Sequence, residues 1–471
     1  YVRKNDRTKN DLTISDIRRL SIAPVCPYWS PIVPSEIDLS VLDSRCKSYQ
    51  GLNDKKYDIH QRKKGCGYYD QYESYLNSDV LIFNSYKYLL ETVMNRKPAT
   101  DLEIIDECDE FLDSLSNQKT INLNRLAMAL GGLFSEKEEG MEAIRKITDL
   151  TNSILRKKPQ KKIVPIGKTR IKELLRLFLD TGLMSYVECD DENYCYHLEE
   201  VAKTFQDFFD QTYLSFESDQ RSESGELIVK LVTTNIEKRF KNLLEKNKVF
   251  VLMSGTIHSQ EVLKEIFGIS DFKIIEAETE DPGKLTVRKT GFELNCKYKN
   301  FREGRINREQ YLYSLNRAVK KSEKPTLVHI TSFFDLPTRE EKEKLGLDLM
   351  TRDEIKRTQN KDKGGEIVNR FKEGQMPVLY TTKCNRGADF PGDTCNSIVI
   401  TKFPYPNIGS LFWQILRKNK PKYFNEFYMD KSRRELLQRI YRGLRSEKDH
   451  VYLLSPDSRI FDRLPSEFSK D

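Results

Sequence analysis

The chain has 471 residues, of which 38% are hydrophobic and 32% are charged, and its formal net charge at pH 7 is +7. This length suits two or three domains rather than one, and the absence of any run of 18 apolar residues means that no membrane-spanning helix is expected. The nine cysteines are scattered and odd in number, which indicates a reducing, cytoplasmic location and no disulfide framework.

The first part of the chain is turn-rich and basic, and residues 31–70 look irregular. The start, Tyr1-Val2-Arg3, is typical of the end of a strand, so we expect an N-terminally incomplete chain; a processed terminus is the alternative. Two apolar runs then predict buried strands, the first leading into a helix. They are "DVLIFNSYKYLL" at 79–90 and "TDLEIIDECDEF" at 100–111.

Residues 114–225 have mostly helical periodicity. One hairpin is expected at 184–198, where "MSYVECDDENYCYHL" alternates on both sides of turn residues. A polar loop is expected at 217–226. A basic amphipathic helix, "NIEKRFKNLLEKN", and another buried strand, "KVFVLMSGTI", follow.

From about residue 263, short apolar runs alternate with helical patterns. The apolar runs are "PTLVHITS", "MPVLYTT", "SIVITKFPYP" and "HVYLLSPD". Strand–helix alternation of this kind predicts a parallel sheet covered by helices.

The first motif that carries chemistry is the carboxylate pair Asp106-Glu107, which follows two isoleucines. Mg²⁺ prefers hard oxygen ligands, and a carboxylate just beyond a strand can reach such an ion. The adjacent carboxylate can orient or deprotonate an attacking water. An ordinary acidic strand end is the alternative.

Two further stretches place polar residues directly after apolar runs. "VLMSGTI" presents Ser254 and Thr256 around a glycine, which allows a tight turn with two hydroxyls near a ligand. In "TTKCNRGADFPGD", Gly387 permits a positive φ or close approach of a ligand. Asp389 can hold a ribose hydroxyl or an arginine. Turns without a ligand are the alternative at both places.

The fourth motif is "QRIYRGLRS", where Gln438, Arg442 and Arg445 are spaced i, i+4 and i+7. This spacing predicts one helical face for all three. Arginines so placed can neutralise the charge that develops on a transferred phosphate. A solvated basic face is the alternative.

The order of these motifs is far more specific than any one of them, and it resembles superfamily 2 helicases, more narrowly the XPD/DinG branch. "CGYYDQYESYLNSDVLIFNSYKYLL" resembles the branch's Cys-Pro-Tyr-Tyr helix and the strand after it. The other motifs resemble its Asp-Glu-Ala-His box, its Ser-Gly-Thr-Leu motif and its motifs V and VI. These strings are "IIDECDEF", "VLMSGTI", "RGADFPGD" with "IVITKFPYP", and "QRIYRGLRSEKDHVYLLSPDSR".

The resemblance implies an α/β fold with two RecA-like lobes and parallel sheets, a mostly helical arch-like insertion, and ATP and Mg²⁺ as cofactors. The resemblance also implies roles for the site residues. Asp106 and Glu107 would bind Mg²⁺ and activate water, and Ser254 and Thr256 would couple the nucleotide site to the bound strand. Gly387 and Asp389 would lie at the cleft between the lobes, and Gln438, Arg442 and Arg445 would reach ATP.

Some features depart from the family pattern. Cys108-Asp109 stands where the family has Ala-His, and Tyr441 where it has glycine. "IGKTR" at 166–170 follows the Asp-Glu box and lacks the earlier glycine that a phosphate loop requires. We interpret Lys168 as an ordinary basic residue and expect the true loop before Tyr1, so that this chain alone would be inactive.

XPD-type enzymes usually carry an iron–sulfur cluster held by four cysteines. The candidates here are Cys26, Cys46 and Cys66, with His60 as a further donor. Cys66 matches the family's last ligand by its "CGYY" context. Three widely spaced cysteines leave a [4Fe-4S] cluster, zinc and no metal as open alternatives.

Two basic stretches, "HQRKKG" at 60–65 and "KRFKNLLEKNK" at 238–248, are candidates for contact with nucleic acid. Tyr68, Tyr69 and Trp29 can offer stacking faces. A solvated helix face and buried aromatic rings are the alternative.

We therefore expect an ATP-dependent helicase or translocase acting on single-stranded DNA in repair or replication, with no membrane partner. An RNA helicase and a degenerate nucleic-acid-binding protein without ATP turnover are the alternatives. The expected domains are lobe 1 at 1–113 with a cysteine-bearing insertion at about 24–68, the arch-like insertion at 114–226, a return to lobe 1 at 227–262, and lobe 2 at 263–471.

Overall fold

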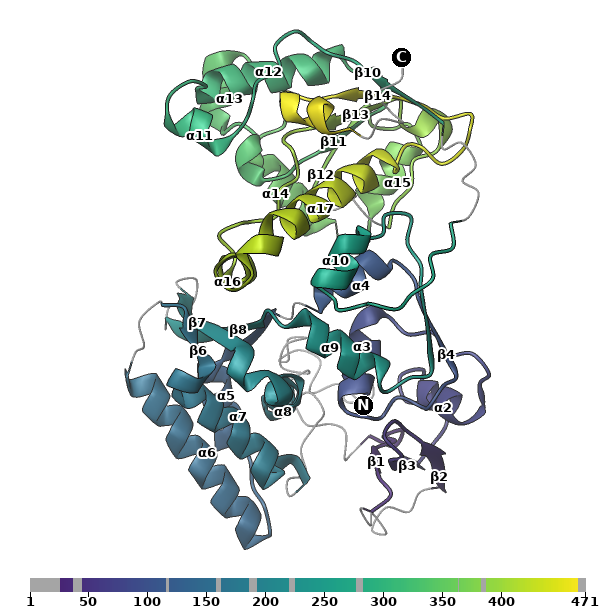
Figure 1. The fold of residues 1–471 in the computed structure, drawn as a ribbon, viewed down its shortest axis with the longest axis vertical. Coiled ribbons are helices and arrows are strands. Elements are labelled where there is room, and N and C mark those ends of the chain that lie inside the picture. Colours follow the sequence, from purple (N-terminus) through teal and green to yellow (C-terminus); the bar gives the residue numbers. More distant parts are fainter. Residues whose placement is uncertain are drawn as a thin grey trace, which may run out of the picture. The chain divides into compact units, whose positions relative to one another are not determined.

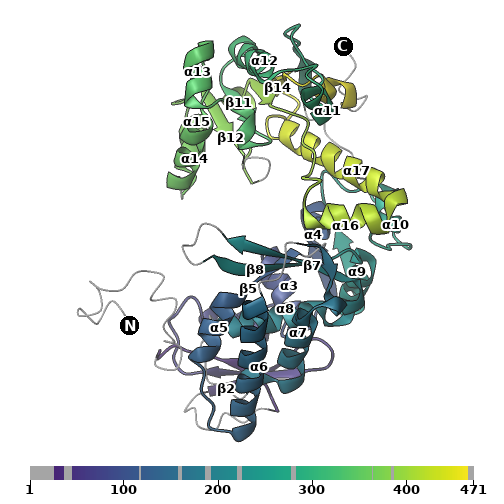
Figure 2. The same ribbon diagram turned by 90° about the vertical axis from the view of Figure 1, so that its left-hand side faces the viewer.

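The computed structural model describes residues 26–36, 45–115, 118–157, 162–185, 193–219, 225–276, 283–362, 364–382 and 387–464. The chain divides into two compact units (Figures 1 and 2). The first comprises residues 1–255, 264–269 and 409–421, and the second comprises 256–263, 270–408 and 422–471. Among the described helices, none combines the length and the apolar character needed to cross a membrane.

The first unit begins with a small antiparallel sheet of order β1-β3-β2. Its strands are β1 (Ile32–Pro34), β2 (Arg45–Gln50) and β3 (Lys56–Gln61). Tyr49, Tyr57 and Ile59 are buried on one face and pack with tyrosines from the segment leading into α2 (Ser74–Asn77). This part of the chain is therefore more regular than its sequence indicates.

The prediction of a strand at 79–84 is wrong, whereas the predicted helix after it is confirmed as α3 (Ser85–Val93). Asn84 begins this helix by accepting a hydrogen bond from the backbone N–H of Lys87 at 2.8 Å. Val80 is 76% exposed and Ile82 94%. Among the described residues no strand pairs with this segment, and an apolar run without a hydrogen-bonding neighbour is not held as a strand.

The strands predicted around the first and second motifs are confirmed as β4 (Leu102–Ile105) and β9 (Val249–Leu252). They pair in parallel, with Ile105 opposite Leu252. Ile105 is buried, but Leu102 and Ile104 are exposed, so only one face of this pair is covered by described residues. β4 leads into α4 (Cys108–Ser114), and β9 is followed by α10 (Gln260–Glu265).

In the described residues of the segment expected as a mostly helical insertion, there are four α-helices and also an antiparallel sheet of order β5-β8-β7-β6. The helices are α5 (Leu123–Gly131), α6 (Glu138–Lys157), α7 (Arg170–Thr181) and α8 (Tyr194–Phe205). The strands are β5 (Gln118–Asn122), β6 (Val164–Pro165), β7 (Thr212–Asp219) and β8 (Glu226–Thr233). Helices and sheet share one apolar core.

Two predictions in this segment are wrong. The second half of the hairpin expected at 184–198 is the start of α8, which Asn193 caps by accepting from the N–H of Cys195 at 2.9 Å; residues 186–192 lie outside the described part. The loop expected at 217–226 is wrong at its two ends, where residues 217–219 belong to β7 and Glu226 to β8; residues 220–224 lie outside the described part of the chain. Charged residues such as Glu217 and Lys230, paired at 2.7 Å, obscure the alternation in the sequence.

The second unit has a five-stranded parallel sheet of order β10-β14-β13-β11-β12. Four strands are the predicted ones: β11 (Thr326–His329), β12 (Val378–Thr381), β13 (Ser397–Ile400) and β14 (His450–Leu454). The short β10 (Lys284–Val287) was not predicted. The α/β class with parallel sheets is thereby confirmed.

Helices cover both faces of this sheet (Figure 1). Alternate strand residues such as Leu327 and Ile398 pack with α15 and α17, and their neighbours Val328 and Val399 pack with α12 and α14. The helices are α11 (Tyr298–Arg302), α12 (Arg308–Lys321), α13 (Arg339–Leu345), α14 (Arg352–Lys361), α15 (Glu366–Lys372) and α17 (Pro421–Ile440). α16 (Leu411–Asn419) belongs to the first unit, as does α9 (Ile236–Leu244).

Candidate nucleotide site

Asp106 and Glu107 lie at the carboxyl end of β4, and both are exposed. Glu107 has φ 48° and ψ 46°, the left-handed conformation that residues other than glycine rarely adopt. Such a conformation costs about 1–3 kcal/mol and persists where the surrounding structure enforces it, often at functional sites. The backbone N–H of Glu107 also donates to Asp106 Oδ1 at 2.9 Å. The carboxylate pair is thus presented by a constrained turn.

The turn after β9 is joined to the turn after β4. The backbone N–H of Cys108 donates to the carbonyl of Met253 at 2.9 Å, and Ser254 Oγ donates to Asp109 Oδ1 at 2.9 Å. Asp109 is fully buried. The structure therefore brings the first two motifs together through Asp109, which sequence reasoning treated only as a departure. The signal in the sequence was a pair of acidic residues, Asp109 and Glu110, in the first turn of α4, and it does not indicate which of the two is buried.

The chemistry of the carboxylate pair fits Mg²⁺, because two exposed oxygen donors at a strand end suit a hydrated hard cation. "IGKTR" does not provide a phosphate loop. It is a 3₁₀ turn, Ile166–Lys168, after a two-residue strand of an antiparallel sheet. Within the described ranges, no Gly-Lys-Thr sequence follows a parallel strand. Lys168 is an ordinary basic residue, as interpreted.

In the second unit, Asp389 is the partner of both arginines of the fourth motif. Its Oδ1 accepts from Arg442 Nη1 at 2.7 Å and also from Arg445 Nη2. The backbone N–H of Phe390 donates to the carbonyl of Arg442 at 2.8 Å. Gly387 has φ +73°, which confirms the turn expected there. The third and fourth motifs therefore meet, and Asp389 holds arginines in this structure.

The prediction that Gln438, Arg442 and Arg445 share one helical face is wrong. α17 ends at Ile440, and both arginines lie beyond it. Gly443 packs so closely on the sheet that an added Cβ would lie 3.0 Å from Val451 Cγ2. A residue larger than glycine would therefore be tightly packed at this position.

Gln438 and Thr256 are nonetheless in contact within the second unit. Gln438 Nε2 donates to Thr256 Oγ1 at 2.8 Å, and both side chains are buried. Thr256 is two residues from Ser254 in the second motif. The hydroxyl of Ser254 bonds Asp109 within the first unit, and the hydroxyl of Thr256 bonds Gln438 within the second.

Sequence reasoning missed Asp449, a buried carboxylate behind the arginine pair. Its Oδ1 accepts from the N–H of Gly392 at 2.8 Å, and its Oδ2 accepts from the N–H groups of Arg445 and Ser446 at 2.6 and 2.8 Å. Burial opposes ionisation of Asp449, but these backbone donors outweigh it and lower its pKa. Asp449 thus fixes the loops that carry Asp389 and Arg445.

Asp449→Asn is expected to destabilise the second unit by about 1–3 kcal/mol, because the amide nitrogen replaces an acceptor and leaves partly buried hydrogen-bond donors unpaired. Thermal unfolding followed by circular dichroism measures this. The contribution of a carboxylate with a lowered pKa is present above its unfolded pKa and is lost as the pH falls through the folded pKa, so the difference from wild type should shrink in acid.

The control for this substitution is Asp393→Asn, at an exposed aspartate one residue from Gly392. It changes the charge equally and should shift stability by no more than about 0.5 kcal/mol. Equal effects of the two substitutions would contradict the role given to Asp449.

The second basic stretch is largely occupied by contacts within the protein. Lys238 Nζ donates to the carbonyl of Asp207 at 2.7 Å, Lys246 Nζ to that of Thr92 at 3.2 Å, and Lys248 is paired with Asp101 at 2.5 Å. In the first stretch, Arg62 lies over the ring of Trp29 at 5.6 Å and Lys63 over that of Tyr28 at 5.2 Å. The first stretch places basic groups beside aromatic rings, so it stays a candidate for contact with nucleic acid.

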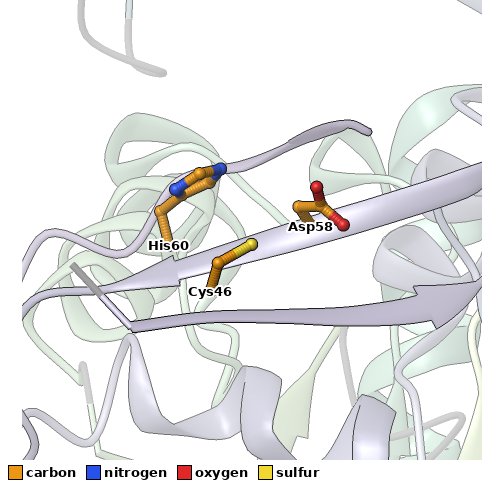
Figure 3. Close-up of side chains that lie close together, drawn as sticks. All are labelled: Cys46, Asp58 and His60. Atoms are coloured by element: carbon orange, nitrogen blue, oxygen red, sulfur yellow. The ribbon is translucent and has the colours of Figure 1, made fainter. Parts of the chain in front are cut away.

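The structure groups one candidate cysteine with other donors. Among the described His, Cys, Asp and Glu side chains, one set of at least three has ligand atoms within 4.8 Å of one another, and it consists of Cys46, Asp58 and His60 (Figure 3). Cys26 and Cys66 are not members of this set. Neither is in a disulfide.

Comparison with protein-family models matches residues 315–471 to the helicase C-terminal domain. This part of the chain is similar to helicase C-terminal domains. The match supports the resemblance to helicases that the motifs indicate. The matched region includes Gly387, Asp389 and the fourth motif, so the paired Asp389, Arg442 and Arg445 lie in the part of the chain that is similar to a helicase domain.

Solved structures similar to the chain include an XPD helicase, 15% identical over 82% of this chain and 70% of that one, with a TM-score of 0.45. An apo XPD is 16% identical over 77% and 75%, with a TM-score of 0.43. Xpd4 of S. tokodaii is 18% identical over 79% and 74%, with a TM-score of 0.46. A search of curated proteins found no match.

Proposed function

We propose that the protein is an ATP-dependent helicase or translocase of the XPD/DinG type that moves along single-stranded DNA in repair or replication. The observation that carries this proposal is Glu107, a carboxylate held in a left-handed turn after a parallel strand, in a chain with a helicase C-terminal domain. A strained acidic residue at that position suits a group that must face an attacking water.

In the proposed mechanism Asp106 would hold Mg²⁺, and the ion would supply positive charge to the nucleotide phosphates. Glu107 orients the attacking water and accepts its proton at the side-chain carboxylate. Arg442 and Arg445 donate to the transferred phosphate. Two arginines share the single carboxylate of Asp389, so this group of three keeps a net positive charge that suits a phosphate.

Ser254, Asp109, Thr256 and Gln438 are proposed to pass the state of the nucleotide to the DNA-binding surface. Ser254 bonds Asp109, which follows Cys108 at the start of α4. A movement of the turn that carries Asp106 and Glu107 would therefore displace the turn after β9. Thr256 bonds Gln438 in the second unit. A serine–aspartate contact takes the place of the histidine that the family uses there.

Ser254→Ala should lower the ratio of DNA-stimulated to unstimulated ATPase about tenfold, equivalent to about 1.4 kcal/mol for a hydrogen bond to a charged group. Steady-state ATPase rates with and without single-stranded DNA measure the ratio. Ser114→Ala removes a hydroxyl of α4 that bonds the carbonyl of Phe111 and should leave the ratio unchanged. An unchanged ratio in Ser254→Ala would remove this contact from the coupling.

The choice of nucleic acid is tested by measuring ATPase stimulation of the natural protein with single-stranded DNA and RNA of equal length. Stronger stimulation by DNA is expected. Stimulation by RNA alone would instead assign an RNA helicase. Tight binding of either without ATP turnover would assign a binding protein.

A further inference from the structure

The sheet β1-β3-β2 places three metal-binding side chains on one face. Cys46 on β2 is directly opposite His60 on β3, and Asp58 is two residues before His60. Side chains alternate between the faces of a strand, so residues two apart and direct cross-strand partners share a face. Figure 3 shows the Cys46 sulfur directed between the Asp58 carboxylate and the His60 ring. Tyr49, Tyr57 and Ile59 occupy the opposite, buried face.

The donor atoms are close enough to serve one ion. The sulfur, a carboxylate oxygen and an imidazole nitrogen lie within 4.8 Å of one another. Zinc bonds nitrogen at about 2.0–2.1 Å and sulfur at about 2.3 Å. Small rotations of the three side chains are enough to meet those bond lengths.

Neighbouring side chains support the carboxylate. Ser35 Oγ donates to Asp58 Oδ1 at 2.6 Å. His60 is 8% exposed, and its backbone N–H donates to the carbonyl of Pro31 at 3.0 Å. Outer hydrogen bonds of this kind orient the ligands of metal sites.

We propose that Cys46, Asp58 and His60 bind one divalent zinc-type ion. A sulfur, nitrogen and oxygen donor set selects Zn²⁺ over Mg²⁺ or Ca²⁺. Three protein ligands leave a fourth position for water or another ligand. This site is independent of the ATP-driven activity proposed above, and it uses one of the three cysteines that the family resemblance nominates for a cluster.

The site would stabilise the surface that follows β3. The ion would join β2 to β3 at His60, and Arg62 and Lys63 come next in the chain, over the rings of Trp29 and Tyr28. The ion would thus hold the start of the first basic stretch against its aromatic partners.

The test is titration of metal-free protein with Co²⁺, followed by absorbance. One equivalent should give the visible bands of a four-coordinate ion with a thiolate-to-metal band, and Zn²⁺ should displace them. Cys46→Ser and Asp58→Asn should each weaken binding by more than the ~10–100-fold that loss of an outer hydrogen bond costs. Ser35→Ala should lose about 10–100-fold.

Cys26→Ser and Cys66→Ser are the matched controls and should bind Co²⁺ as the wild type does. Circular dichroism of each variant confirms folding, which Cys46→Ser should preserve because Cys46 is exposed. Absence of a thiolate-to-metal band in the wild type would overturn the proposal. Dependence of the bound metal on Cys26 and Cys66 rather than on Asp58 would also overturn it.

Discussion

Glu107→Gln should leave ATP binding within a few-fold of wild type and reduce hydrolysis by about 10²–10⁴-fold, the usual contribution of a general base. The amide has the shape of the carboxylate but cannot accept a proton. Glutamine also keeps the same demand on the left-handed turn at φ 48°, so the backbone should not relax. Binding of a fluorescent nucleotide and steady-state phosphate release measure the two quantities separately on the natural protein.

The control for Glu107→Gln is Glu138→Gln, at an exposed glutamate in the first turn of α6. It makes the same chemical change far along the chain from the carboxylate pair and should leave hydrolysis unchanged. Retention of wild-type turnover by Glu107→Gln would refute the role of Glu107 as the base. Loss of nucleotide binding as well would indicate that the turn itself, and not proton transfer, was affected.

Arg442→Ala should reduce the ATP turnover number by about 10³–10⁵-fold, the range measured for arginines that neutralise a transferred phosphate. Arg442 is 7% exposed and bonds Asp389 at 2.7 Å. Its loss leaves Asp389 paired with Arg445, so the carboxylate keeps a cation and the fold should survive. Arg442→Lys keeps the charge but loses the planar fork, and its turnover should fall between those of wild type and Arg442→Ala.

Arg433→Ala is the matched control, because Arg433 is an exposed arginine on α17. It should change neither turnover nor melting temperature by a measurable amount. A folded Arg442→Ala protein with turnover within about threefold of wild type would contradict the assignment. If its melting temperature falls with turnover, Arg442→Lys decides whether charge or packing was lost.

Strong strand–helix alternation made the second unit predictable. Four of its parallel strands coincide with apolar runs read from the sequence, and β10 was missed because its four residues, Lys284–Val287, give too short a pattern. The prediction of a strand at 79–84 failed because strand pairing depends on which segments meet in the folded chain. No described strand pairs with the segment that holds the exposed Val80 and Ile82.

Sequence motifs identified the candidate site residues, but they did not indicate which residues hydrogen-bond to them. Helical spacing predicted that Arg442 and Arg445 lie on one face, whereas α17 ends at Ile440, before both of them. Asp109 and Asp449 act through hydrogen bonds to segments distant in sequence. No short stretch of the sequence indicates a hydrogen bond between segments that are far apart along the chain. The grouping of Cys46 with Asp58 and His60 likewise depends on the register of β2 on β3.

The central claim is that ATP hydrolysis drives movement along single-stranded DNA, and the most direct measurement is strand displacement. A labelled strand annealed beside a single-stranded loading region is mixed with the natural protein and ATP. The account predicts displacement with ATP, none with a non-hydrolysable analogue, and none with Glu107→Gln. Displacement that is independent of ATP, or ATP turnover without any displacement or movement on DNA, would contradict it.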